Sequence, residues 1–198
     1  MNRDRWMWGR SRTVDVMLRP RRQYAQQMAA RAAGSWPQAL AGPALLAVLL
    51  GITTSIAATG RVVASLVVSQ TLCWTFVPLL QLGAGAALVA SAPRRPVSFA
   101  RALELFFAAH GPWSIWLVAA AGMQMVTPQQ NPVIASAVAP LLWTTWLVYA
   151  YTREVLGLAP RQAQLRTIAQ LAVTVLLILV YMEFASRLSV RFIGLFQR

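Results

Sequence analysis

The side chains that could carry chemistry in this chain are few and lie far apart. His110 is the only histidine, and it stands in the apolar run "RALELFFAAHGPWSIWLVAAAG", six residues after Glu104. Six residues of helix separate the two by about 9 Å along the axis and place them on different faces. Near Arg101, Glu104 is better explained as a solvated residue. An ionisable side chain inside a membrane helix is a functional hypothesis by default, so His110 could ligate a haem or chlorophyll, or carry a proton.

Pro112 gives a structural interpretation of His110, and we favour it over cofactor binding. Proline has no amide hydrogen, so the carbonyl of Ala108 loses its usual helical donor. A neutral imidazole can stabilise such a kink through hydrogen bonds, at much lower cost than a fixed charge in a membrane. We therefore expect neither a bound cofactor nor proton transfer at His110.

The motifs of the common enzyme and metal sites do not occur in the sequence. The chain has no His-Glu-x-x-His, Gly-x-Ser-x-Gly, Walker or Cys-x-x-Cys pattern. Cys73 is the only cysteine, which excludes a disulfide framework and a cysteine-rich metal site. Glu183 precedes Arg187 by four residues, the order that favours a helical ion pair. We expect no catalytic residues, no metal ligands and no enzyme.

The amino-acid composition indicates whether water or a lipid bilayer surrounds these side chains. Of 198 residues, 58% are hydrophobic and 12% are charged, whereas soluble domains carry about 25% charged residues. Intervals without any charged residue separate Arg31 from Arg61, Arg61 from Arg94, and Glu104 from Arg153. Since about 20 apolar residues cross a bilayer core, the composition predicts an integral membrane protein.

Five transmembrane helices account for these apolar intervals. The second is too long for a straight crossing, so we expect a kink at Pro78 or an end that projects from the hydrocarbon. The sequence thus predicts an all-α, polytopic helix bundle. Its five spans cover residues 40–59, 62–90, 103–124, 133–151 and 167–186.

The segment that precedes the spans is predicted to lie on the membrane surface. Pro20 suits the first position of a helix and Gly34 suits its end, so residues 20–33 should form an amphipathic interfacial helix. A short solvated helix or a disordered tail is the alternative. The N-terminus does not read as a signal peptide. The residues expected to bind lipid, including anionic headgroups, are Arg21, Arg22, Tyr24, Met28 and Arg31.

Arginine counts set the predicted orientation. The net charge is +13, and 8 of the 18 basic residues, all arginine, lie in the first 31 residues. Alternate segments starting with the N-terminus hold 14 arginines and the opposite segments hold 4, which places the N-terminus in the cytoplasm and the C-terminus outside. We reject a nucleic-acid partner, because these arginines flank apolar runs instead of forming a basic stripe.

The predicted units are a cytoplasmic arginine-rich segment (1–36), a transmembrane domain (37–190) and a C-terminal tail (191–198) that leaves the membrane or lies flat on it. Small residues in the spans should let helix backbones approach closely, in "LGAGAA" at 82–87 and in "AAAG" at 119–122. A nucleotide-binding loop is a superficial alternative for the first of these, since the strand context is missing. The packing residues are expected to be Gly83, Gly85 and Gly122.

Several segments resemble the Yip domain family of small membrane proteins. They are "DVMLRPRRQYAQQM" before the spans, "VSFARALELFFAAHGPW" at the start of the third span, and "WLVYAYTREVLGLAPRQAQLRTIAQ" between the fourth and fifth. The resemblance covers residues 15–186 and implies the same five-span layout. Eukaryotic members bind prenylated Rab-type GTPases, whereas bacterial members are mostly of undefined role. The lysine-free composition fits a GC-rich bacterium, so the trafficking role is not carried over.

The sequence therefore predicts a non-catalytic protein of the bacterial inner membrane. It would act as a scaffold or accessory subunit by helix packing against other membrane-protein subunits. A small transporter or channel is one alternative, because Pro78, Pro112 and Pro140 offer broken helices, although no charge lies deep in a span. A cofactor-bearing subunit of an electron-transfer or photosynthetic complex is another, and it rests on His110 alone.

Overall fold

The chain is helical throughout the residues that the structure, a computed structural model, describes. These are residues 14–29, 34–93, 97–126 and 133–196, and no strand occurs among them. The predicted all-α fold class is therefore confirmed. A helical turn over residues 14–18 comes first. The helices that follow are α2 (Pro20–Ala29), α3 (Trp36–Thr59), α4 (Ala64–Trp74), α5 (Phe76–Ala90), α6 (Phe99–Ala108), α7 (Gly111–Val126), α8 (Val133–Ser136), α9 (Val138–Glu154) and α10 (Pro160–Phe196).

Among the described residues, three helical stretches are long and apolar enough to cross a bilayer. They are Trp36–Thr59, Ala64–Ala90 and Pro160–Tyr181, and the bent pair of α6 and α7 would be a fourth. These are the features of a helical membrane protein, as the composition predicts. The fourth predicted span, residues 133–151, coincides with α8 and α9, helices of 4 and 17 residues.

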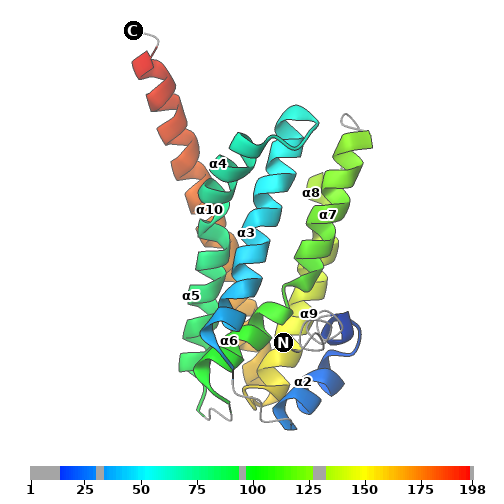
Figure 1. The fold of residues 1–198 in the computed structure, drawn as a ribbon. Coiled ribbons are helices and arrows are strands. Elements are labelled where there is room, and N and C mark those ends of the chain that lie inside the picture. Colours follow the sequence, from blue (N-terminus) through cyan, green and yellow to red (C-terminus); the bar gives the residue numbers. More distant parts are fainter. Residues whose placement is uncertain (1–13, 30–33, 94–96, 127–132, 197–198) are drawn as a thin grey trace.

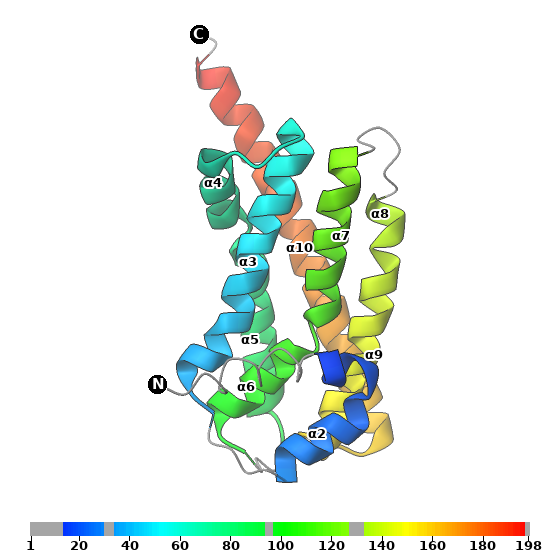
Figure 2. The ribbon, with the colours of Figure 1, turned by 45° about the vertical axis from the view of Figure 1, so that its right-hand side comes forward.

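The long helices run side by side, and two short helices lie across one end of the bundle. α2 and α6 occupy this end in both views (Figure 1, Figure 2), and we call it the base. The chain leaves the base along α3, returns along α4 and α5, leaves along α7, returns along α8 and α9, and leaves again along α10. With 37 residues, α10 is about 55 Å long and extends past the other helices.

Three helices break three residues before a proline. A proline cannot donate to the carbonyl four residues back, and its ring collides with that carbonyl, so the preceding turn yields. The kink expected at Pro78 is thus the break between α4 and α5. The pairs of break and proline are Thr75 and Pro78, Ala109 and Pro112, and Ala137 and Pro140.

The third predicted span, residues 103–124, needs correction, because it is not one helix. α6 and α7 are bent by 40° at their break, and α6 lies across the base while α7 rises along the bundle (Figure 2). Two boundaries also differ from the prediction. The loop expected at 152–166 is shorter, since α10 begins at Pro160, and α10 continues as helix to Phe196 through most of the expected tail.

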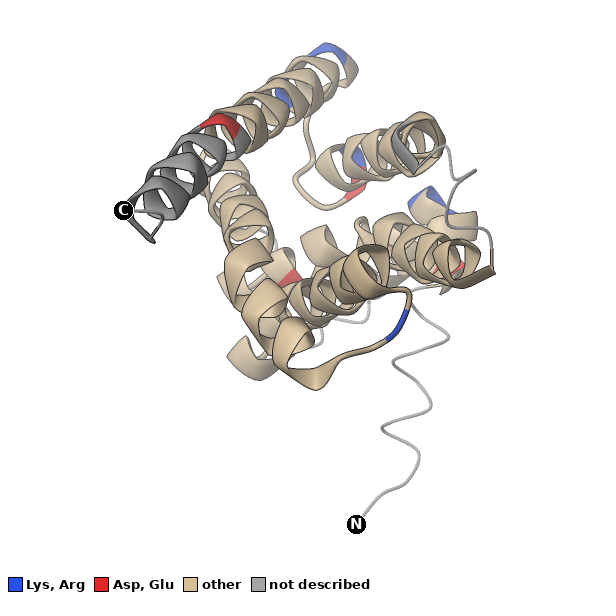
Figure 3. Ribbon diagram, turned by 90° about the horizontal axis from the view of Figure 1, so that it is seen from above, with Lys and Arg blue, Asp and Glu red and all other residues tan. Residues whose placement is uncertain are grey.

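The hydrophobic core lies at the base. Leu103, Leu105 and Phe106 of α6 are each at most 1% exposed, and they belong to a cluster with buried residues of α2, α5 and α9. By contrast, α4 has no buried residue. Packing against protein is therefore concentrated at the base. Seen from the opposite end, almost all of the ribbon is neither basic nor acidic (Figure 3), as lipid contact requires.

Gly60 turns α3 into α4 at the end opposite the base. Its φ of 72° lies in the left-handed region that favours glycine, and its N–H donates to the carbonyl of Ile56 at 2.7 Å. The buried hydroxyl of Ser55 accepts a hydrogen bond from the N–H of Val63 at 3.0 Å. These contacts close the two helices into a tight hairpin.

The glycines expected at helix contacts differ in their surroundings. A Cβ added to Gly85 would lie 2.6 Å from the ring of Phe106, so α5 approaches α6 closely there. A Cβ added to Gly83 or Gly122 would meet nothing within 4 Å. Only the first of the three therefore lies against another helix of the described chain.

We expect Gly51→Ala to destabilise the α3–α4 hairpin. The added Cβ would collide with the side chain of Thr71 and would lie 2.8 Å from the carbonyl oxygen of Val67. Overpacking of this kind costs about 1 to 3 kcal/mol of unfolding free energy. Gly83→Ala is the control, because its Cβ would enter open space. The midpoint of thermal unfolding in detergent should fall for Gly51→Ala alone, and equal midpoints would contradict this packing.

Candidate functional site

A cavity of about 410 Å³ lies inside the bundle. Its walls come from α3, α4, α5, α7, α9 and α10, and most of the lining residues are apolar. Small-molecule sites typically enclose about 300 to 1,000 Å³ and combine such walls with a few polar groups. The polar side chains that line this cavity are Gln81, His110, Thr144, Thr145, Gln170 and Thr174.

The three helix breaks meet at this cavity. Residues at or next to each break contribute to its wall. Because a broken helix leaves backbone groups without their regular partners, breaks inside a membrane protein are tolerated where they are buried in protein or line a cavity. The lining residues next to the breaks are Trp74, Val77, His110, Trp113, Ala137 and Val138.

His110 compensates for the tightened backbone at the second break. Its N–H donates to the carbonyl of Phe107 at 2.9 Å, three residues back instead of four. Its Nδ1 lies 3.2 Å from the carbonyl oxygen of Phe106, the acceptor that a regular helix would have given to that N–H. The imidazole thus makes the kind of contact that the structural interpretation predicts, although to the carbonyl of Phe106 and not to that of Ala108.

Polar side chains link His110 to two further helices. Its Nε2 lies 3.2 Å from Gln81 Oε1 on α5, and the same oxygen lies 3.1 Å from Gln170 Nε2 on α10. Gln170 Nε2 also lies 3.4 Å from Thr174 Oγ1, one turn further along α10. We call these four side chains the amide network. His110 is 5% and Gln81 9% exposed, so the network is shielded from solvent.

The protonation state of His110 follows from these contacts. A carbonyl oxygen only accepts, so Nδ1 must carry the proton that faces Phe106. A neutral ring then accepts at Nε2, which requires the NH2 group of Gln81 to face it. Turning a side-chain amide by 180° exchanges its nitrogen and its oxygen without changing the distances to its neighbours. When Gln81 and Gln170 are both turned, the NH2 group of Gln81 donates to His110 and to Gln170. Thr174 then donates to the carbonyl of Gln170. We assign this neutral arrangement because no acidic side chain lines the cavity to balance an imidazolium.

Thr144 is buried in the cavity wall. Its hydroxyl oxygen makes no hydrogen bond with any described residue, whereas the hydroxyl of the next residue, Thr145, donates to the carbonyl of Leu141 at 2.7 Å. A buried polar group left unpaired costs about 1 to 3 kcal/mol. Because Thr144 lines the cavity, rotation about its Cα–Cβ bond would allow this hydroxyl to bind a polar atom of a ligand.

Ligation of haem or chlorophyll would require His110 to give up a bond. Both ring nitrogens have hydrogen-bond partners, and Nε2 would have to leave Gln81 before it could bind a metal. In the part of the chain that the structure describes, no group of three His, Cys, Asp or Glu side chains could hold a metal ion.

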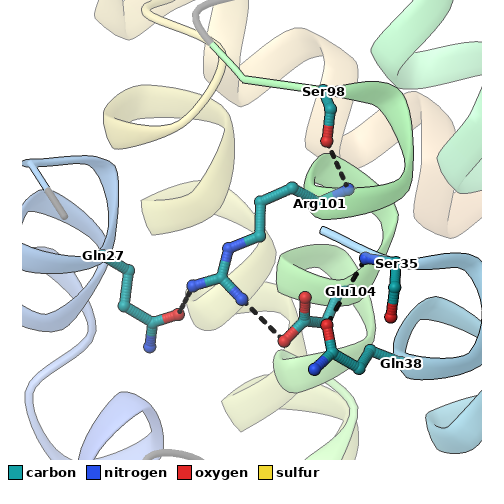
Figure 4. A network of polar contacts seen from close by, with 6 residues as sticks. All are labelled: Gln27, Ser35, Gln38, Ser98, Arg101 and Glu104. Carbon is teal, nitrogen blue, oxygen red and sulfur yellow. Dashed lines mark hydrogen bonds and ion pairs between the residues drawn. The ribbon is translucent and has the colours of Figure 1, made fainter. Parts of the chain in front are cut away.

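A second polar cluster links α2 to α6 at the base (Figure 4). Arg101 on α6 is 4% exposed. Its Nη1 donates to Glu104 Oε1 at 2.6 Å and its Nη2 donates to Gln27 Oε1 on α2 at 3.0 Å. Glu104 is thus not the solvated residue that we expected, because it neutralises a buried guanidinium. Gly34 allows the chain to pass close to Arg101, since a Cβ there would collide with the backbone of that residue.

Tyr24 lies on the apolar face of α2 and packs this helix against α6 and α9. It is 0% exposed, and its ring packs edge-on against that of Tyr151, with centroids 5.9 Å apart. Burial raises the pKa of the Tyr24 phenol, so the hydroxyl stays protonated and donates to the carbonyl of Leu105 at 3.3 Å. Tyr24 therefore contacts protein where we expected it to contact lipid.

The other residues expected to bind lipid lie in different surroundings. Arg21 and Arg22 are exposed on α2. Met28 is half-buried against the core of the base. Arg31 lies outside the described residues. Among the described residues of this set, Arg21 and Arg22 are thus the ones whose side chains are exposed, and their contact with anionic headgroups stays a prediction.

Sequence reasoning missed three residues of the cavity, namely Gln81, Thr144 and Gln170. A signal existed for the two glutamines, because an uncharged amide inside an apolar run is costly in a membrane unless it is hydrogen-bonded. The runs are "PLLQLGA" and "TIAQLAV". Thr144 gave no signal, since neighbouring threonines can bond to their own helix.

No protein-family model matches the chain, and no curated protein or solved structure is significantly similar to it. The function of the cavity must therefore be inferred from its own residues.

We expect Arg101→Ala to release α2 from its contacts with α6 and α9. The change leaves Glu104, whose side chain is 27% exposed, without its counter-charge and the half-buried Gln27 without its donor, which costs about 1 to 3 kcal/mol. Chymotrypsin cleavage after Tyr24 measures the release, because this residue is buried when α2 is docked. Cleavage in detergent should be at least about tenfold faster than in the parent protein. The exposed residue Arg22, changed to Ala, provides the control, and equal rates for both variants would contradict the docking role.

Proposed function

We propose that this chain is a non-catalytic membrane protein that binds a small, neutral, amphipathic molecule inside its helix bundle. The observation that carries the proposal is an apolar cavity whose wall holds an unpaired hydroxyl, Thr144, together with the amide network. Among the described lining residues none is charged, and an ionic ligand would be left without a counter-charge in a medium where that is costly. A neutral ligand with an apolar body satisfies both conditions.

The proposal places the base on the cytoplasmic side of a bacterial inner membrane, with the end of α10 outside. Cytoplasmic loops retain arginine, and Arg61 is the arginine at the turn opposite the base. Residues 133–154, from α8 to α9, would span about 33 Å and complete five crossings. The resemblance to the Yip domain family implies the same layout. The described arginines of the base are Arg19, Arg21, Arg22, Arg101, Arg153, Arg161 and Arg166.

Transport is a second candidate, and the convergence of three helix breaks on one cavity favours it. Transporters commonly bind substrates between discontinuous helices near the middle of the bilayer. A flux assay in proteoliposomes, with a ligand that binds the cavity, would separate transport from binding alone. The sequence also predicts association with other membrane subunits, which would use the open faces at Gly83 and Gly122. This association is compatible with ligand binding and with transport.

Filling the cavity should abolish ligand binding. Ala137 lines the cavity, whereas Ala139, two residues along the same segment, is exposed on its outside. The neutral amphiphile 4-octylphenol should raise the unfolding midpoint of the parent protein and of Ala139→Phe in nanodiscs, because a ligand that binds only the folded state stabilises it. It should not raise that of Ala137→Phe. Decanoate and decylammonium should have no effect. An equal shift in both variants would place binding outside the cavity.

Labelling of single cysteines tests the orientation. In a Cys73→Ser background, Arg61→Cys and Ala159→Cys each introduce a thiol at an exposed turn, on opposite ends of the bundle. A membrane-impermeant maleimide should label the first on intact spheroplasts and the second only after permeabilisation, because arginine-rich segments stay in the cytoplasm. The reverse pattern would invert the proposed topology.

A further inference from the structure

In both orientations of its two amide groups, the amide network leaves hydrogen-bond donors and acceptors that a ligand could use. In the neutral arrangement, the carbonyl of Gln81 and the NH2 group of Gln170 have no partner within the described chain. With both amides turned the other way, so that the carbonyl of Gln81 faces His110 and Gln170, the NH2 group of Gln81 and the carbonyl of Gln170 are unused instead. One amide donor and one amide acceptor are therefore available in either case, in addition to the hydroxyl of Thr144.

The two amides contact each other, whereas Thr144 stands on a separate helix. The side-chain amides of Gln81 of α5 and Gln170 of α10 are 3.1 Å apart, and Thr144 belongs to α9, which also packs against α10. A ligand that used both the amides and the hydroxyl would need more than one polar atom. A fatty acid or a simple alcohol, which has one polar end, would leave part of this capacity unused.

Tryptophan rings form part of the remaining wall. Trp74, Trp113 and Trp116 line the cavity, and the last two pack edge to face with centroids 5.7 Å apart. The indole N–H of Trp116 donates to the hydroxyl of Ser136 at 3.0 Å, so this ring offers the cavity an apolar surface and no donor. Aromatic surfaces of this kind favour a planar ring in the ligand.

Resting on the proposed function, we propose that the ligand is a membrane quinone or its quinol. A quinone ring is neutral and planar, and it carries carbonyl oxygens at opposite edges, which suit the Thr144 hydroxyl and an amide NH2. The quinol hydroxyls suit the remaining amide carbonyl. About 410 Å³ accommodates the ring and short substituents, so a long alkyl chain would extend between the helices into lipid. The ligand is bound without chemical change.

Tryptophan fluorescence tests this inference directly. The full chain is placed in nanodiscs of synthetic, quinone-free phosphatidylcholine and titrated with 2-decyl-1,4-benzoquinone, because quinones quench nearby indoles. We expect a saturable component of quenching. Thr144→Val should weaken binding about fivefold, the effect of one hydrogen bond, and Thr144→Ser should restore it. Thr152→Val is the matched control, since this buried residue of the same helix donates to the carbonyl of Tyr149 and does not line the cavity. It should change the affinity by less than about twofold.

A second probe separates this inference from the proposed function. Decylbenzene has the same chain and ring but no oxygen, and it should compete at least about tenfold more weakly than the quinone, since it makes none of the hydrogen bonds. Equal competition, or equal effects of Thr144→Val and Thr152→Val, would overturn the quinone class while leaving a site for neutral amphiphiles. Absence of saturable binding by both probes and by 4-octylphenol would overturn both proposals. The unfolding midpoint of each variant shows that it is folded.

Discussion

A proline in a membrane helix removes a backbone hydrogen bond where no water can replace it, and three such losses organise this structure. Each helix yields in the turn before its proline, at Thr75, Ala109 and Ala137. Other contacts take over nearby: the N–H of Thr75 bonds three residues back to Leu72, and the imidazole of His110 bonds to Phe106. The breaks face one another, so the places where the backbone is least regular also form the wall of the cavity.

The two ends of the molecule are stabilised in different ways. The base resembles the core of a soluble protein, with buried aromatic rings, a buried ion pair at Arg101 and a docked amphipathic helix. Towards the other end, α4 buries no side chain, and exposed residues such as Leu72 and Leu179 need lipid around them. The cavity lies between the firmly packed base and the lipid-dependent half.

The sequence predicted the helical class and three of the five apolar segments, 40–59, 62–90 and 133–151, to within a few residues, because a charge-free apolar interval of about 20 residues matches the thickness of a bilayer core. It did not predict that α6 turns under the bundle. Pro112 indicates a break, but only the packing of Phe106 and its neighbours decides the direction of the helix before it. The amide network was also beyond prediction, since Gln81 and Gln170 stand 89 residues apart and meet only in the folded bundle.

The docking of α2 has a consequence for the way the protein is made. Tyr24 contacts Leu105 and Tyr151, so α2, which is synthesised before α6 and α9, has no complete binding surface until both of these helices have followed. During synthesis its apolar face must be covered by something else, and the surface of the membrane offers a suitable environment for an amphipathic helix. Arg101, with its partners Gln27 and Glu104, would then close the base as a late step of assembly, after the helices above it have been inserted.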